Sequence, residues 1–153
     1  MTELQFTIPL DPKSKKNSQK IVTICGRPRI VQGTAYGKYE KLCKEFVPEL
    51  ARPIDYPVNV KCLFYREKRL RVDLPNLLAA IDDILVKYGV LSDDNRDIVA
   101  SHDGSTVHWD KQNPRTEVTI TPLTDYTQWG ELIHGQEDKK GSSTKGRASL
   151  RKR

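Results

Sequence analysis

The sequence predicts a mixed α/β (α+β) domain, with a mixed β-sheet and two main helices. Several short segments alternate apolar and polar residues, as strands do, and two longer segments repeat apolar residues at three- and four-residue spacing, as amphipathic helices do. The two kinds of segment are interleaved along the chain. With 153 residues, of which 37% are hydrophobic and 30% charged, the chain has the size and composition of one compact domain.

The first half of the chain predicts three strands and a helix. Residues 4–10 alternate like a strand, and residues 20–31 form two short β runs broken by Gly26-Arg27-Pro28, which predicts a hairpin. Residues 34–51 follow Gly33 and carry a helical stripe that should stop near Pro53. The stripe consists of Tyr36, Tyr39, Leu42, Cys43, Phe46, Val47 and Leu50. It indicates a core-facing helix.

The second half predicts a strand, the clearest helix and three short strands. Residues 57–65 alternate regularly, and Pro75 suits the first turn of a helix that ends at Gly89. The apolar face of this helix is formed by Leu77, Ile81, Ile84, Leu85 and Tyr88. Its opposite flank carries Asn76 and Asp83, whereas Asp82 points elsewhere. A turn at 93–95 precedes strands predicted at 98–100, 107–109 and 117–121.

The end of the chain differs in composition. Residues 137–153 hold seven lysines and arginines against two acids, a net charge of +5, with few apolar side chains. We expect this segment to be a disordered basic tail, either solubilising or attracted to phosphates. Residues 124–136 are expected to form a docking segment. The predicted organisation is therefore a domain over 1–123, a docking segment over 124–136 and a tail over 137–153.

Several classes of protein are disfavoured by the sequence. No apolar run approaches the ~20 residues that span a bilayer, and the first residues lack the pattern of a secretory signal, so we expect a cytoplasmic protein without membrane contact. Cys25, Cys43 and Cys62 are odd in number and widely spaced, which favours reduced thiols over a disulfide framework. The absence of a CxxC pair disfavours zinc.

Charge changes sign along the chain. Residues 13–29 hold basic side chains and no acid, and residues 66–71 hold four basic side chains and one acid. Residues 73–103 then hold seven aspartates against two bases. The basic segments predict attraction to a polyanion, and clustered carboxylates favour a hard divalent cation. Solvated surface is the alternative interpretation of the acidic segment.

The order of the aspartates around the second helix indicates a nuclease. Asp73 precedes the helix, and Asp93 and Asp94 follow it, so one helix could bring carboxylates together around a divalent metal. Such a metal polarises a phosphoryl oxygen, lowers the pKa of a bound water and stabilises the leaving oxygen of a cleaved phosphodiester. The alternative is that Asp73 caps the helix and Asp93-Asp94 form an ordinary turn.

These segments resemble a known family. The stretch Arg71-Val72-Asp73-Leu74-Pro75-Asn76-Leu77, the helix with Asp83, and Gly89-Val90-Leu91-Ser92-Asp93-Asp94 are similar to the RusA family of Holliday junction resolvases, the crossover junction endodeoxyribonucleases. The order of elements over 4–122 also fits that family, including a proline-containing loop with Asn17 and a late strand Pro114-Arg115-Thr116-Glu117-Val118. The chain would be a divergent member.

The resemblance implies a homodimer that binds four-way DNA junctions and nicks them symmetrically with Mg²⁺ or Mn²⁺. By position, Asp73 and Asp94 match essential aspartates, here assigned as metal ligands, and Asn76 matches the motif asparagine. Asp93 and Asp83 match frequent family acids. Pro75 stands where the family has a second aspartate, and Ala79 where it has a functional lysine. Family members often belong to phages or prophages, which places the protein in a bacterial or phage-infected cell.

The two departures direct attention to substitutes. Asp103 and Asp83 are the first candidates for a relocated ligand, with neighbouring His102 as a base or ligand. Lys15, Lys16 or Arg71 are the first candidates for a replacement cation. The expected DNA-binding side chains are Lys13, Lys15, Lys16, Asn17, Lys20, Arg27, Arg29, Arg69, Arg71 and Asn76.

Two other functions are considered. The first is a branched-DNA-binding protein that has lost catalysis through Pro75 and Ala79. The second, a helix-turn-helix transcription factor, is disfavoured because the clearest helix has an acidic exposed flank.

Overall fold

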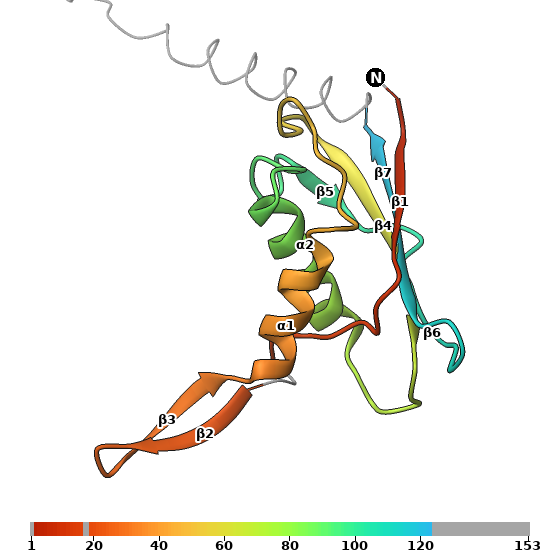
Figure 1. The fold of residues 1–153 in the computed structure, drawn as a ribbon. Helices are drawn as coiled ribbons and strands as arrows, with labels where there is room; N and C mark the ends of the chain where they lie inside the picture. Colours follow the sequence, from red (N-terminus) through yellow and green to blue (C-terminus); the bar gives the residue numbers. More distant parts are fainter. Residues whose placement is uncertain (1, 17–18, 124–153) are drawn as a thin grey trace, which may run out of the picture. The chain divides into compact units, whose positions relative to one another are not determined.

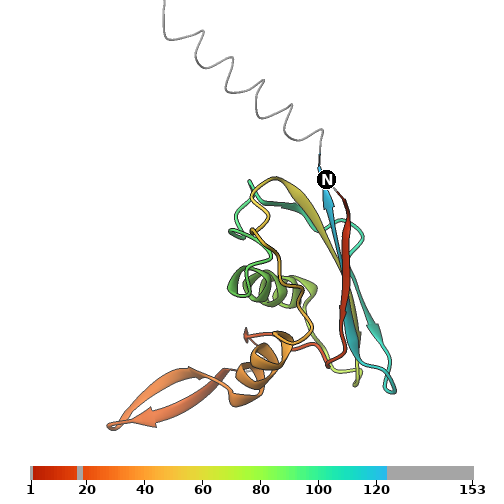
Figure 2. The same ribbon diagram turned by 45° about the horizontal axis from the view of Figure 1, so that its top comes forward.

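The computed structural model describes residues 2–16 and 19–123 and contains a mixed sheet with helices on one face (Figures 1 and 2). The predicted docking segment and tail lie outside the described residues. In chain order the elements are β1 (Leu4–Ile8), β2 (Gln19–Ile24), β3 (Arg27–Gln32), α1 (Thr34–Cys43), β4 (Val58–Arg66), α2 (Leu74–Lys87), β5 (Val99–Ser101), β6 (Thr106–Trp109) and β7 (Arg115–Pro122). The predicted mixed α+β fold with two main helices is confirmed.

Strand β4 lies at the centre of the main sheet. It pairs antiparallel with β7, which in turn pairs with β1, and its other edge pairs parallel with both β5 and β6. Because strand side chains alternate between faces, Val58, Val60, Cys62 and Phe64 are all buried against the helices. The predicted alternation of this segment is thereby confirmed.

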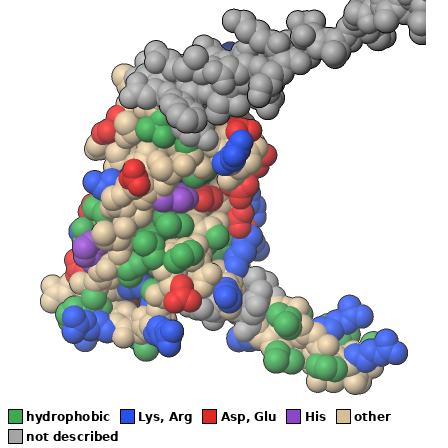
Figure 3. All heavy atoms as spheres, turned by 180° about the vertical axis from the view of Figure 1, so that it is seen from behind, with side chains coloured by type: hydrophobic (Ala, Val, Ile, Leu, Met, Phe, Trp, Pro, Cys, Tyr) green, Lys and Arg blue, Asp and Glu red, His purple; other side chains and the backbone are tan. Residues whose placement is uncertain are grey.

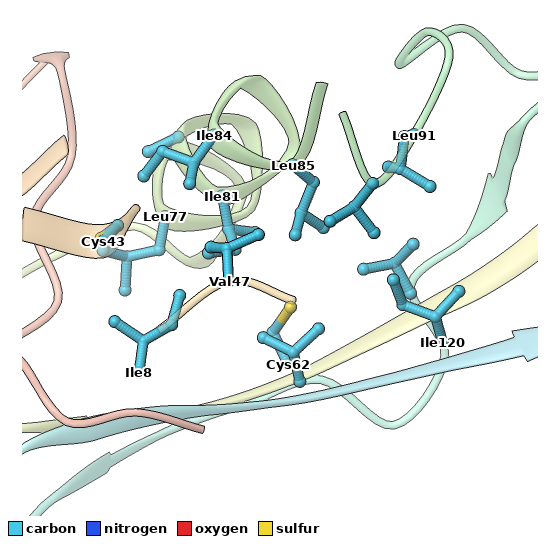
Figure 4. Close-up of a cluster of buried hydrophobic side chains, with 14 of the residues drawn as sticks. Ile8, Cys43, Val47, Cys62, Leu77, Ile81, Ile84, Leu85, Leu91 and Ile120 are labelled. Carbon is cyan, nitrogen blue, oxygen red and sulfur yellow. The ribbon is translucent and has the colours of Figure 1, made fainter. Parts of the chain in front are cut away.

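Helix α2 supplies the largest apolar surface that covers the sheet. In Figure 4 its side chains Leu77, Ile81, Ile84 and Leu85 lie over Ile120 and the other labelled side chains of the sheet. The helix ends in a Schellman motif: Gly89 has φ 76°, its N–H donates to the Val86 carbonyl, and the Val90 N–H donates to the Leu85 carbonyl at 2.9 Å. Gly89 is therefore the stop that the sequence predicts.

Helix α1 is shorter than predicted. It ends at Cys43 rather than near Pro53, and three turn residues follow it. The reason is Pro48, since a proline disfavours the helical conformation of the residue before it. Val47 nevertheless remains buried in the core, with its N–H bonded to the Cys43 carbonyl at 3.1 Å. The apolar periodicity therefore continues beyond the end of the helix.

The two helices are joined by polar contacts. The Lys87 ammonium pairs with the Glu40 carboxylate, and the Tyr88 hydroxyl donates to the Glu40 carbonyl at 2.8 Å. These contacts hold the C-terminal end of α2 against α1.

In the described residues, no helix is long and apolar enough to cross a membrane.

Strands β2 and β3 form a separate hairpin. The predicted hairpin is confirmed, but its turn is at Cys25-Gly26, with φ 52° and 75°, and not at Gly26-Arg27-Pro28. Two successive positive φ values are typical of a two-residue turn between twisted strands. Pro28 lies within β3 opposite Thr23, which a two-stranded ribbon tolerates because its edges are free.

Candidate nucleic-acid interface

A basic groove lies between the end of β4, the loop that follows it and β6. It has a volume of about 650 Å³ and is lined by Arg66, Lys68, Arg69, Leu70, Arg71, Val107, His108 and Trp109. Among its described lining residues there is no carboxylate. Figure 3 shows Lys and Arg side chains gathering at this end of the body and on the hairpin. Such a concentration of positive charge attracts phosphates.

Hydrogen bonds fix the shape of the basic groove. Nη1 of Arg66 donates to the Leu70 carbonyl at 2.7 Å, which closes the loop after β4. Nε1 of Trp109 donates to the Glu67 carbonyl at 2.9 Å, and the Arg69 guanidinium lies 5.4 Å from the centroid of the indole ring. Trp109 is thus held in place although 52% of its surface is exposed.

A second cavity continues the groove toward α2. It has a volume of about 390 Å³ and shares Arg66, Leu70 and Arg71 with the basic groove, adding Val72 and Asp73. A polyanion bound in the basic groove would therefore extend to the carboxylate of Asp73. Arg71 and Asp73 were predicted to belong to one site, and the structure places both on this cavity.

Asp73 occupies the N-cap position of α2 without using its side chain as a cap. Its backbone is extended and its carbonyl accepts the Asn76 N–H at 3.1 Å, but its carboxylate makes no capping hydrogen bond to a described residue. Instead, Nδ2 of Asn76 lies 3.4 Å from Oδ2 of Asp73. The exposed carboxylate thus remains accessible to a ligand, with Asn76 beside it.

An acidic cluster, Asp83, Asp93 and Asp94, lies further along the chain. Partial burial raises the pKa of Asp94, and the neighbouring carboxylates of Asp93 and Asp83 raise it further. The structure therefore brings the loop after α2 within electrostatic reach of the helix flank. A bound cation stabilises the charged form of a carboxylate whose pKa is raised by neighbouring carboxylates.

Asp93 makes local hydrogen bonds in the loop after α2. Its two carboxylate oxygens accept the Asp94 N–H at 2.7 Å and Nδ2 of Asn95 at 2.9 Å. The turn in this loop lies at 96–98, where Oδ1 of Asn95 accepts the Asp97 N–H at 2.9 Å. The turn predicted at 93–95 is therefore found three residues later, with Asn95 as the residue that initiates it.

The cluster and Asp73 are separated along α2. Asp83 is ten residues after the N-cap Asp73, which is about 15 Å along a helix axis. One metal ion bound through side chains at ~2.1 Å cannot contact both carboxylates. Asp83 and Asp94 are thus within electrostatic reach of each other, whereas Asp73 lines the cavity that continues the basic groove.

Lys15 approaches the acidic cluster from the loop after β1. Its Nζ lies 2.8 Å from Oδ2 of Asp83. Ala79 is one helical turn before Asp83 on the same flank of α2, because residues four apart are neighbours on a helix surface. The Lys15 ammonium therefore lies against the flank of α2 that Ala79 shares with Asp83. Lys16 is exposed beside it in the chain.

Asp103 lies on a different part of the sheet. Its N–H donates to Oδ1 of Asn59 at 2.7 Å, and Nδ2 of Asn59 donates back to its carbonyl at 3.2 Å. The Asn59 side chain points away from the face that the helices cover, since its neighbours Val58 and Val60 point toward it. The structure does not bring Asp103 to the acidic cluster or to Asp73.

His102 forms a structural ion pair with Asp82. Its Nδ1 lies 2.8 Å from the Val60 carbonyl and its Nε2 lies 2.9 Å from Oδ2 of Asp82. Both partners are acceptors, so both ring nitrogens donate and the imidazolium is the form that fits. Burial lowers the pKa of His102, but the hydrogen bond and charge of Asp82 outweigh it and raise the pKa overall. Neither ring nitrogen is left to act as a base or a ligand.

The basic side chains of the hairpin share one face. Lys20 is opposite Val31, Arg29 opposite Val22 and Arg27 opposite Ile24, and directly paired residues point to the same side. The other face carries Ile21 and Ile30, which are 75% and 70% exposed. The structure thus brings Lys20, Arg27 and Arg29 together.

Two further predicted DNA-binding residues are Lys13 and Asn17. Lys13 pairs with Asp11 at 2.9 Å, and Oδ1 of Asp11 accepts the Glu67 N–H at 3.0 Å, so the loop that carries Lys13 is attached beside the basic groove. Asn17 lies outside the described residues.

Neither a family model nor a curated protein sequence matches the chain.

The described side chains offer few ligands for a metal ion. In the part of the chain that the structure describes, no three His, Cys, Asp or Glu side chains form a group that could hold a metal ion. Mg²⁺, however, is often bound by one or two carboxylates, with water and substrate phosphates completing its shell. Asp83 and Asp94 are two carboxylates of the type that such an ion uses.

Sequence reasoning missed two features of this surface. The sequence places Trp109 only in a short strand, and nothing in that segment signals that its side chain is exposed. The Asp82–His102 pair was missed because it depends on β5 leading back against α2, which spacing does not reveal. The four basic residues in 66–71 are the sequence signal that locates the basic groove.

Proposed function

We propose that this chain is a metal-dependent, structure-specific endodeoxyribonuclease that resolves Holliday junctions by paired phosphodiester nicks during DNA recombination, repair or phage DNA processing. The observation that carries the proposal is the basic groove, which continues into a cavity ending at Asp73 on the helix that also carries Asp83. The RusA-like motifs support the same activity. We propose that the protein acts as a homodimer in the cytoplasm of a bacterial or phage-infected cell.

In this proposal the basic groove binds the DNA backbone. Arg66, Lys68, Arg69 and Arg71 would neutralise successive phosphates, a contact that positions DNA without reading its sequence. The basic face of the hairpin, with Lys20, Arg27 and Arg29, would bind a second part of the branched substrate. A four-way junction is recognised by shape, so phosphate contacts should dominate its recognition.

The acidic cluster would hold the Mg²⁺ or Mn²⁺. Asp94 and Asp83 are carboxylates within electrostatic reach of each other, and Asp93 would orient Asp94 by accepting its N–H. When bound, the ion would supply a polarised phosphoryl oxygen and a water of lowered pKa. Asp73, which the motif also assigns to the metal, would act where the groove delivers the phosphate.

Lys15 would take the place of the lysine missing at Ala79. Its ammonium lies against Asp83, where it can interact with a phosphate held near the acidic cluster. We therefore expect Lys15→Ala to reduce junction nicking, and Ala79→Lys in the same chain to restore part of it. Restoration would not follow if Lys15 only stabilised the loop that carries it.

The test of the proposal is incubation of the purified full chain with labelled four-way junction, matched linear duplex and single strand, with and without Mg²⁺ or Mn²⁺. Binding and nicking are read separately. Paired nicks that appear only on the junction and only with metal support the proposal. Nicking of all three substrates, or nicking without metal, would contradict it.

A second function is favoured by a specific observation. The described residues hold no group of three metal-ligating side chains, and the sequence lacks the family acid at Pro75 and the family lysine at Ala79. These facts favour a protein that binds branched DNA without cleaving it. Tight junction binding with no cleavage at any metal concentration would support this alternative over the nuclease.

A further inference from the structure

The basic groove contains an aromatic side chain that phosphate binding does not explain. We infer that the groove binds an unpaired nucleotide of the DNA, whose base stacks on the indole of Trp109. This inference rests on the proposed function for the nature of the substrate. It adds that the substrate must present a base outside the double-helical stack.

The first argument is the exposure of Trp109. Its side chain is 52% exposed, although tryptophan is among the side chains that gain most from burial. Val107 and Leu70 also line the groove and are also exposed. The groove thus exposes an aromatic ring and two aliphatic side chains among cations. This composition suits a flat, apolar ligand that is attached to negatively charged phosphates.

The second argument is that the ring is fixed before any ligand binds. The Nε1–H of Trp109 donates to the Glu67 carbonyl at 2.9 Å, and the strand that carries it is paired with the end of β4, where Trp109 is opposite Arg66. A ring held by both a hydrogen bond and a strand register loses little freedom when a base stacks on it. Trp109 therefore has the properties of a preformed stacking platform.

The third argument is the arrangement of charge around the ring. The Arg69 guanidinium lies 5.4 Å from the indole centroid, and Lys68 and Arg71 line the same groove. A base on the indole would therefore have its own phosphates among these cations. The groove volume of about 650 Å³ lies within the range of about 300–1,000 Å³ that small-molecule sites occupy.

The ligand must be unpaired because a duplex hides the faces of its bases. Within a double helix each base face is covered by its neighbours, so only an extruded or single-stranded base can stack on a side chain. A duplex arm could use Arg66, Lys68 and Arg71 through its phosphates. It would leave the exposed part of the Trp109 ring without a ligand.

The experiment separates base from phosphate. The chain has two tryptophans, so Trp129→Phe leaves Trp109 as the source of indole fluorescence. The full-length variant is titrated with a short single-stranded oligonucleotide and with an abasic oligonucleotide of the same length and charge. We expect the base-containing strand to quench Trp109 and to bind at least about fivefold more tightly than the abasic strand.

Variants identify the residue responsible. Trp109→Ala should remove the preference for the base-containing strand, and Trp109→Phe should retain part of it, because phenylalanine still offers a ring. Phe46→Ala is the matched control: Phe46 is 37% exposed and lies outside the groove, so the preference should be unchanged. If Trp109→Ala does not fold, the abasic comparison with the Trp129→Phe protein and the Trp109→Phe variant still decides the question.

Equal affinity for the two strands, or binding without quenching, would overturn the inference. That failure is distinct from failure of the proposed function, which is measured by metal-dependent nicking of the junction. Nicking that persists in a protein with no base preference would remove only the stacking site. A base preference in a protein that never nicks DNA would support the stacking site and contradict the nuclease.

Discussion

The basic groove predicts how the affinity for DNA should depend on salt. Arg66, Lys68, Arg69 and Arg71 line it, and each phosphate that a side chain neutralises in duplex DNA contributes about −0.9 to the slope of log K against log salt. If all four side chains contact phosphates, the groove alone contributes a slope of about −3.6. This corresponds to roughly a 150-fold loss of affinity between about 50 mM and about 200 mM salt.

The perturbation that tests this is removal of one charge at a time. Fluorescence anisotropy of a labelled junction, measured over that salt range, should give a slope less steep by about 0.9 in Arg69→Gln and again in Arg71→Gln. Arg52→Gln is the matched control, because Arg52 is exposed and lines neither cavity. Groove variants with the wild-type slope, or an equal change in Arg52→Gln, would refute the assignment of the groove to DNA.

Three further predictions concern stability, each measured by urea denaturation of the full chain. Asp82→Asn should lower the free energy of unfolding by about 2 kcal/mol near pH 6, because it leaves the His102 imidazolium without its counter-charge. Burial lowers the pKa of His102, but Asp82 raises it overall. The stabilisation by the pair is therefore complete below about pH 6.5 and is lost as pH rises through the folded-state pKa. A difference in unfolding free energy between wild type and variant that stays constant to pH 9 would contradict this. Gly89→Ala should cost about 1 kcal/mol through its φ of 76° alone, because no atom lies within 4 Å of an added Cβ. Gly37→Ala within α1 should instead stabilise the protein by about 0.5–1 kcal/mol. Changes of the same sign in the two variants would contradict the backbone argument.

The elements of the fold were largely predictable because periodicity reports burial. The alternation in β4 and the helical stripe of α2 each have one buried face, so their patterns predict both type and position. The end of α1 was not predicted, because Val47 and Leu50 continue the apolar spacing beyond the helix. Pro48 carried the missing information through its effect on the preceding residue.

The site was predictable only where its residues are close in sequence. The basic run after β4 located the groove, and Asp93 and Asp94 were recognised as acidic residues near a turn, which lies at 96–98. Which residues meet across the fold could not be read from spacing. The contact of Lys15 with Asp83, and the position of Asp103 beside Asn59, are set by loop paths that leave no periodic signal.

The measurement that tests the central claim most directly is single-turnover nicking of a four-way junction with Mg²⁺ by wild type, Asp94→Asn and Asp97→Asn, with junction affinity measured in parallel. Asp97 is the matched control, since its side chain is 77% exposed and pairs only loosely with Arg96 at 3.8 Å. We predict that Asp94→Asn lowers nicking by more than about 100-fold while affinity is retained, and that Asp97→Asn nicks like wild type. Wild-type nicking by Asp94→Asn would contradict the metal-dependent nuclease built on this acidic cluster.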